Sequence, residues 1–276
     1  MSQLTPAAPA GALATEVESM QEIMTALDEA VQHDEPVAMA TVVEVKGGSP
    51  AQAGFKMLIR PDGTVVGNVG GGALEQRIRD EAASALRDGR PRLIHYALRE
   101  EGPDAVGTAC GGEVTVFVEP YQPVPTVLIV GGGHIGRPLA EMARVAGLNV
   151  EVVDVRPERA TVPQFDPAAI TPWTYVVIIT ETHAADEHVL RQVLDTPAAY
   201  AGMIGSRRKV RTLFDSLKSE GVSADRLARV RAPIGLDLGG RQPAEIAVAI
   251  LAEILQVRCG GTGQPLSIGA GQRSNE

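Results

Sequence analysis

The chain has 276 residues, 44% of them hydrophobic, and a formal net charge of −9 from 25 basic and 34 acidic side chains. This length favours two domains, and the composition is that of an ordinary globular protein. An acidic chain without a long basic run is a poor partner for nucleic acid or for an anionic membrane. The sequence has no membrane-spanning apolar run, no signal-peptide pattern and two cysteines only, so we expect a cytoplasmic protein.

Residues 1–15 are rich in Ala, Pro and Gly, and we expect them to be disordered. Residues 16–120 are expected to form a smaller α+β domain. Apolar residues at helical spacing predict a first helix near residues 17–31. The elements expected after it are strands at 37–45, 57–59, 64–66, 93–96 and 114–118, with a helix at 74–86 between the third and fourth strands.

Three prolines within residues 120–125 predict an interdomain linker, because proline continues neither a central strand nor a helix. We place the linker at 121–125, a second domain at 126–258 and a flexible tail at 259–276. In the second domain, strands and helices alternate. The strands are expected at 127–130, 150–153, 175–180 and 199–204, and the helices near His134, Asp186, Arg207 and Pro243. This alternation predicts an α/β fold with a Rossmann-like parallel sheet.

Residues 127–136 read VLIVGGGHIG, which places a G-x-G-x-x-G loop directly after a strand. Gly131 permits the tight turn, Gly133 lets a diphosphate approach the backbone, and Gly136 lets the helix pack on the strand. His134 lies within the same loop. The pattern predicts a nucleotide or dinucleotide site, and the alternative is a packing turn without a ligand.

Asp154 ends the next strand, about 20 residues after the loop, where an acidic side chain binds ribose hydroxyls in dinucleotide folds. A carboxylate there repels a 2′-phosphate and favours NAD over NADP. Arg156 lies two residues later and would offset that repulsion, so the preference stays open.

Two more glycine clusters lie in the first domain. Gly70, Gly71 and Gly72 precede a helix and offer an anion site, or else a tight turn that Glu75 merely caps. Cys110 is followed by Gly111 and Gly112. A thiol in a glycine-rich loop is either an inert packing residue or a thiolate suited to a transition metal.

Two polar segments follow strands of the second domain, where parallel sheets bind ligands. His183 and Asp186 are candidates for acid–base work, although Asp186 would equally cap the next helix. Ser206 and Arg207 would bind a phosphate or carboxylate, or form a solvated helix start. The sequence has no Tyr-x-x-x-Lys, C-x-x-C or H-E-x-x-H pattern.

Taken in order, these motifs resemble the XdhC/CoxI family over most of residues 20–257. The blocks that carry the resemblance are Lys46–Met57, Gly70–Glu75, Cys110–Gly112 with Val118–Pro120, Gly131–Gly136 with Asp154–Pro157, Gly205–Lys209, Pro233–Asp237 and Pro243–Ala247.

Members of this family are understood to bind molybdenum cofactor, to protect it while its sulfido ligand is installed, and to pass it to a molybdenum hydroxylase. The resemblance therefore implies a cofactor-insertion chaperone, with molybdopterin as cargo and Cys110 near the metal. It also implies an apo molybdenum hydroxylase as partner, with a cysteine desulfurase and a second copy of the chain as further partners. The alternative is an NAD(P)-dependent oxidoreductase with His183 or Asp186 as its acid or base.

The chain departs from the family pattern at four positions. Ala51 stands where an Arg is common, Gly48 where a Ser is common, Ala73 where a Cys is common and Glu181 where a His is common. These differences indicate a subfamily with a different client enzyme, or one with redox activity of its own. We expect the glycine loop of the second domain to form one wall of a cofactor-handling cleft between the domains, with Cys110 across it.

Overall fold

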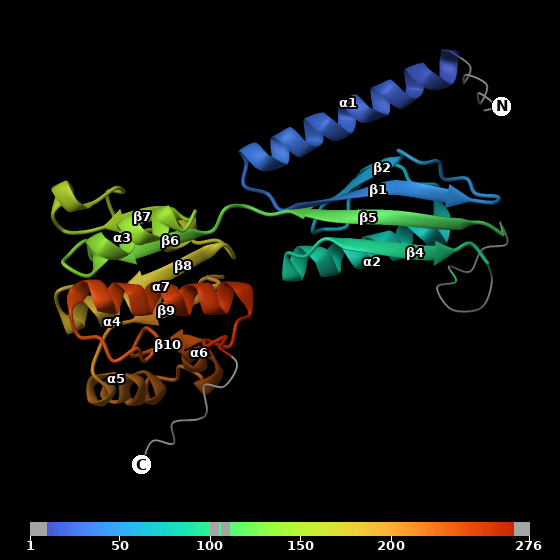
Figure 1. Cartoon of the computed structure of the whole chain (residues 1–276). Coiled ribbons are helices and arrows are strands. Elements are labelled where there is room, and N and C mark those ends of the chain that lie inside the picture. Colours follow the sequence, from blue (N-terminus) through green and yellow to red (C-terminus); the bar gives the residue numbers. More distant parts are fainter. Residues whose placement is uncertain (1–9, 100–104, 106–110, 268–276) are drawn as a thin grey trace. The chain divides into compact units, whose positions relative to one another are not determined.

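The computed structural model describes residues 10–99, 105 and 111–267, with side chains from residue 19 onward (Figure 1). The chain divides into two compact units, Met1–Pro123 and Val124–Glu276. Each unit is built on its own five-stranded sheet.

The first unit is an antiparallel sheet with a helix on each face (Figure 1). Its strand order is β3-β2-β1-β5-β4. The elements in chain order are α1 (Ala10–Gln32), β1 (Val37–Lys46), β2 (Lys56–Ile59), β3 (Val65–Gly67), α2 (Gly72–Asp88), β4 (Arg92–Ala97) and β5 (Glu113–Tyr121).

The alternation of side chains along β1 explains why both faces of this sheet are covered. Ala38, Ala40 and Val42 belong to the core beneath α2, while Val37 and Met39 belong to the core beneath α1. Because successive side chains of a strand point to opposite faces, one apolar strand supplies both cores. All five side chains are buried.

Two sequence expectations for the first unit are wrong. Residues 10–15 were expected to be disordered, but α1 begins at Ala10. Pro120 was expected to end the sheet, but it lies in β5 opposite Ala38 of β1. The neighbouring strand β4 pairs with β5 only as far as Val118. Beyond that point β5 is locally an edge strand, where the missing N–H of proline costs no ladder bond.

The second unit is the expected Rossmann-like domain, with a parallel sheet in the order β10-β9-β8-β6-β7. Its strands are β6 (Thr126–Val130), β7 (Asn149–Val153), β8 (Thr174–Ile178), β9 (Tyr200–Met203) and β10 (Val230–Arg231). Its α-helices are α3 (Gly136–Val145), α4 (His183–Val193), α5 (Arg207–Ser219), α6 (Ala224–Ala228) and α7 (Pro243–Cys259). Short 3₁₀ turns at Pro157–Arg159 and Pro167–Ala169 connect β7 to β8.

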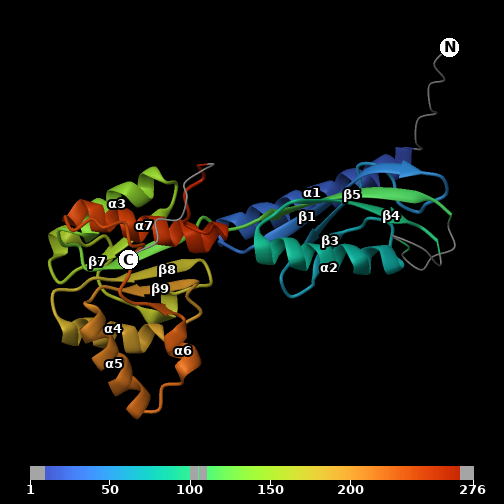
Figure 2. The same cartoon turned by 60° about the horizontal axis from the view of Figure 1, so that its bottom comes forward.

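Helices cover both faces of this sheet (Figure 2). Val127 and Ile129 of β6 pack with α3 and α7 on one face, and Leu128 and Val130 pack with α4 and α5 on the other. The chain leaves β6 for β7 on one side and later returns to β8 on the other side. The carboxyl end of β6 is therefore the topological switch point, where open parallel sheets bind their ligands.

Two short elements of the second unit are absent from the sequence expectations. Strand β10 has two residues and α6 has five, so neither shows a hydrophobic period. The helix expected near Asp186 begins three residues earlier, at His183, with the Thr182 hydroxyl as its N-cap.

Candidate functional site

The glycine loop after β6 is shaped by two close backbone approaches. A Cβ at Gly131, whose φ is 123°, would lie 2.2 Å from the carbonyl oxygen of Ile179. A Cβ at Gly136 would lie 2.0 Å from the carbonyl oxygen of Gly131. By contrast, no described atom lies within 4 Å of the Cβ position of Gly133. Because they lack a Cβ, Gly131 and Gly136 allow β6, the end of β8 and α3 to approach closely. Gly133 leaves the N-terminus of α3 open to a ligand.

Asp154 binds this loop through its carboxylate. Its Oδ2 accepts a hydrogen bond from the N–H of Gly132 at 2.8 Å, and its Oδ1 accepts one from the N–H of Arg156 at 2.9 Å. The side chain expected to bind a ribose is thus oriented by two backbone groups. Each carboxylate oxygen keeps a lone pair for a ligand hydroxyl.

Arg156 and Glu181 form an ion pair beside the loop, with 2.5 Å between Nη1 and Oε1. Arg156 follows β7 and Glu181 follows β8, and these two strands flank β6. The pair therefore joins the two strand ends on either side of the glycine loop. Both side chains are partly exposed, at 38% and 61%.

A hollow of about 700 Å³ opens beside the same loop. Gly132, Gly133 and His134 line one part of it, and α3 and the segment after β7 line the rest. Arg137, Arg144 and Arg159 are among its lining residues, alongside Glu141 and Glu158. The hollow has the size and the donors for a phosphate-bearing ligand.

The loop after β8 is closed by Asp186, which is 4% exposed. Its Oδ1 accepts from the hydroxyl of Thr180 at 2.6 Å and from the N–H of Thr180 at 2.9 Å. Burial raises the pKa of Asp186 above its ordinary value, and the two Thr180 hydrogen bonds oppose that shift. Asp186 thus stabilises the turn, while His183, the other acid–base candidate, is exposed at the first position of α4.

Ser206 and Arg207 lie after β9, at the same carboxyl edge of the sheet. The Ser206 hydroxyl caps α5 by accepting from the N–H of Lys209 at 3.3 Å. Arg207 is exposed, and no described residue pairs with it. The capping explains Ser206 without a ligand.

Three loops of the first unit are brought together by glycine contacts. A Cβ at Gly112 would lie 2.3 Å from the carbonyl oxygen of Gly48. A Cβ at Gly70, whose φ is 123°, would lie 3.1 Å from the Cβ of Ala51. The loop from Gly47 to Ala51 therefore packs against Gly112 at one end and against Gly70 at the other. Ala51, one of the four expected departures from the resembled pattern, is 2% exposed and lies inside this packing.

The triple-glycine loop already has a carboxylate of its own. Oε1 of Glu75 accepts a hydrogen bond from the N–H of Gly71, the N-cap residue of α2, at 3.1 Å. A bound anion would have to displace this carboxylate. Glu75 therefore acts as an internal cap in the structure, and no described atom lies within 4 Å of the Cβ positions of Gly71 and Gly72.

The predicted metal ligand Cys110 lies outside the described residues. Within residues 10–99, 105 and 111–267, no three His, Cys, Asp or Glu side chains are grouped as a metal site. Cys259, the cysteine that is described, is exposed. In the same part of the chain, no helix is long and apolar enough to cross a membrane.

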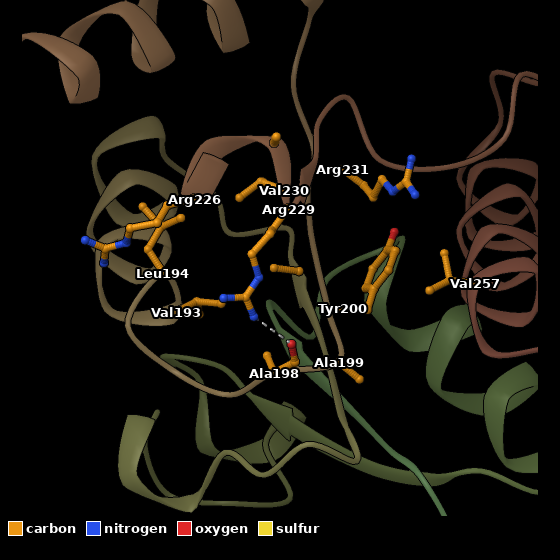
Figure 3. Close-up of a pocket in the computed structure, with 12 residues that line it drawn as sticks. Val193, Leu194, Ala198, Ala199, Tyr200, Arg226, Arg229, Val230, Arg231 and Val257 are labelled. Carbon is orange, nitrogen blue, oxygen red and sulfur yellow. Dashed lines mark hydrogen bonds between the residues drawn. The ribbon is translucent and has the colours of Figure 1, made fainter. Parts of the chain in front are cut away.

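A second hollow, of about 210 Å³, lies at the amino ends of β9 and β10 (Figure 3). Arg229 extends across it and donates to the carbonyl oxygen of Ala198 at 3.4 Å. Tyr200 borders it, and its hydroxyl donates to Oε2 of the buried Glu253 at 2.5 Å. Since parallel sheets bind ligands at their carboxyl ends, the glycine loop is the stronger candidate.

The glycine loop after β6 and the polar loop after β8 were both predicted as candidate site regions, but one contact at each was missed. Glu181 was noted as a departure from the family pattern, without its partner Arg156. Thr180 was not identified as the partner of Asp186. Both contacts join residues close to strand ends. The order of β7, β6 and β8 in the sheet would have revealed the contact between Arg156 and Glu181.

Comparison with known proteins agrees with this architecture. The model of the XdhC Rossmann domain matches residues 127–254, and the model of the XdhC and CoxI family matches residues 30–97. Together the two models cover most of the chain, in the order that the two units have. The chain belongs to the XdhC/CoxI family.

Three curated relatives are similar over most of this chain. The uncharacterized protein YqeB of Escherichia coli is 34% identical over 83% of this chain, which spans only 44% of YqeB. The molybdenum cofactor insertion chaperone PaoD of Escherichia coli is 23% identical, over 83% of this chain and 86% of PaoD. A protein of Bacillus subtilis named as a probable xanthine dehydrogenase subunit is 23% identical, over 87% of this chain and 98% of that protein.

Among solved structures, one titled as a xanthine dehydrogenase from Bacillus halodurans is 22% identical. The match covers 84% of this chain and 94% of that one, with a TM-score of 0.43.

Proposed function

We propose that the protein is a maturation factor that binds molybdenum cofactor and delivers it to an apo molybdenum hydroxylase. The observation that carries the proposal is the packing of Gly112 on Gly48 and of Gly70 on Ala51. This packing brings together three segments on which the family resemblance rests, Lys46–Met57, Gly70–Glu75 and Cys110–Gly112. The last of these segments includes Cys110 in the sequence. Similarity to a protein named as a molybdenum cofactor insertion chaperone supports this proposal.

The chemistry of the described residues fits an anionic ligand at one loop better than at the other. Gly133 leaves the N-terminus of α3 open, and helix N-termini favour phosphate. At Gly71, the Glu75 carboxylate occupies the corresponding position. We therefore assign the phosphate of a cofactor or nucleotide to the Gly131–Gly136 loop, and we assign the soft metal centre to Cys110.

The test is to produce the protein in a host that makes molybdenum cofactor and to identify the released small molecules by mass spectrometry. We expect a pterin from the wild-type protein and much less from Cys110→Ala. The matched control is Cys259→Ala, which removes an exposed cysteine and should keep the pterin content. Activation of an apo molybdenum hydroxylase should follow the same order. Wild-type protein without pterin, or full activation by Cys110→Ala, would contradict the proposal.

A second candidate function is an NAD(P)-dependent oxidoreductase, which the loop and Asp154 favour. Asp186 is a weak acid–base candidate, because Thr180 donates two hydrogen bonds to one of its oxygens. This function requires that NAD(H) raise the melting temperature of the second unit and that a hydride acceptor be reduced. Two further partners stay predictions. Pull-down from a host that makes molybdenum cofactor would test binding of a cysteine desulfurase, and light scattering would test whether two copies of the chain form a dimer.

A further inference from the structure

The ion pair between Arg156 and Glu181 lies where a nucleotide on the glycine loop would place its ribose. Asp154 is fixed at that position by the N–H groups of Gly132 and Arg156. Arg156 is two residues from Asp154, and its guanidinium is held by Glu181 at 2.5 Å. A group attached to the ribose next to Asp154 would therefore meet this ion pair.

The charges around Arg156 are predominantly negative. The close contact and the charge of Glu181 raise the pKa of Arg156, and Asp154 and Glu158 add to the shift. Three carboxylates thus act on one guanidinium. A 2′-phosphate would gain Arg156 as a partner only if Glu181 released it. Without that release, the phosphate would meet uncompensated negative charge.

We propose that Glu181 determines which nucleotides this loop accepts. By holding Arg156, it restricts the site to nucleotides whose ribose carries free 2′- and 3′-hydroxyls, which Asp154 binds. Nucleotides with a 2′-phosphate are rejected, and removal of the Glu181 charge frees Arg156 to bind that phosphate. This assignment rests on the proposed phosphate site at the Gly131–Gly136 loop.

The pair is suited to such a role because it is partly exposed. Exposed ion pairs contribute little to stability, so substitutions at either residue should leave the fold intact. The guanidinium can form a bidentate contact with a phosphate in place of its Nη1–Oε1 contact with the carboxylate. A change at position 181 would therefore alter ligand choice without altering the loop.

The test compares the affinities of 5′-ADP and adenosine 2′,5′-bisphosphate by calorimetry. Wild-type protein should bind 5′-ADP more tightly. Glu181→Gln should shift the ratio of the two affinities toward the 2′-phosphate by about tenfold, the effect of one charge-assisted contact. Glu181→Gln combined with Arg156→Gln should lose that gain, because the gain acts through Arg156.

The matched control is Glu158→Gln, which removes a nearby carboxylate that no described ion pair uses. It should shift the ratio much less than Glu181→Gln. If 5′-ADP binds but Glu181→Gln leaves the ratio unchanged, or shifts it no more than Glu158→Gln, the role of Glu181 is overturned while the nucleotide site stands. If neither probe binds any variant, the nucleotide site and this assignment both fail.

Discussion

The hydroxyl of Tyr200 in β9 donates a 2.5 Å hydrogen bond to Oε2 of Glu253 in α7, and the same oxygen accepts from the N–H of Gly235 at 3.0 Å. Glu253 is 8% exposed, so these donors replace the water that its carboxylate loses on folding. The contact ties the last helix to the sheet at the end opposite the glycine loop.

We expect Tyr200→Phe to lower the free energy of unfolding of the second unit by about 1–3 kcal/mol, because it leaves a buried carboxylate without one of its donors. Urea denaturation measures this loss. Tyr175→Phe is the matched control. The Tyr175 ring stacks on that of Tyr200 with 6.1 Å between centroids, but no described residue bonds its hydroxyl. An equal loss in both variants would show that the hydroxyl contact is not responsible.

Glycine loop variants should separate folding from ligand binding. Gly136→Ala places a Cβ 2.0 Å from the carbonyl oxygen of Gly131, so we expect a loss of about 1–3 kcal/mol in the free energy of unfolding. Gly133→Ala meets no described atom within 4 Å and should keep the stability but weaken phosphate binding. Thermal unfolding with and without 5′-ADP measures both effects. Unchanged 5′-ADP binding by Gly133→Ala would contradict the assignment.

The stability of the second unit should depend on pH through Asp186. Burial raises its pKa in the folded protein above the ordinary 3.8. The proton therefore stabilises the folded state below pH 3.8, and this stabilisation disappears as the pH rises through the folded pKa. Asp186→Asn keeps an oxygen for Thr180 but does not ionise, so its stability relative to wild type should increase over that range.

Urea denaturation at a series of pH values measures this difference. If the difference in the free energy of unfolding between wild type and Asp186→Asn were the same at all pH values, the raised pKa of Asp186 would be contradicted. Asp186→Leu does not ionise either, but it removes the acceptor for Thr180, so it should be about 1–3 kcal/mol less stable than Asp186→Asn at every pH.

Glu75 should behave as a helix cap. Glu75→Ala removes the acceptor of the Gly71 N–H, and we expect a loss of about 0.5–2 kcal/mol in the free energy of unfolding of the first unit. Glu75→Gln keeps an acceptor oxygen and should lose less. If Glu75→Ala instead bound phosphate and gained stability in its presence, the loop would be an anion site whose own carboxylate competes with the ligand.

The sequence predicted the fold correctly where the backbone geometry requires one particular residue type. The spacing of Gly131, Gly133 and Gly136 predicted the Rossmann half, because close backbone approaches at this loop require glycine. The valines of β6 and β7 predicted a buried parallel sheet. Strand β10 was missed because two residues carry no period, and Pro120 was misjudged because its local edge position depends on where β4 ends.

Contacts between distant segments could not be predicted from local sequence patterns. Arg156 meets Glu181 because β7 and β8 flank β6, an order that no local pattern encodes. The sequence left open whether the turn that Glu75 caps also binds an anion, and it predicted a ribose contact for Asp154. The structure shows each carboxylate accepting a hydrogen bond from its own glycine loop. A carboxylate near a glycine-rich turn has the same sequence signature in both roles.

Each sheet has hydrophobic clusters composed entirely of residues from its own unit. Heating should therefore produce two calorimetric transitions rather than one, and a single melting temperature would not describe the chain. A substitution at the glycine loop should move one transition and leave the other in place. Calorimetry can thus separate two causes of an inactive variant. A shifted or missing transition indicates that one unit has lost its fold, and two unchanged transitions indicate that a folded protein has lost a binding or reacting group.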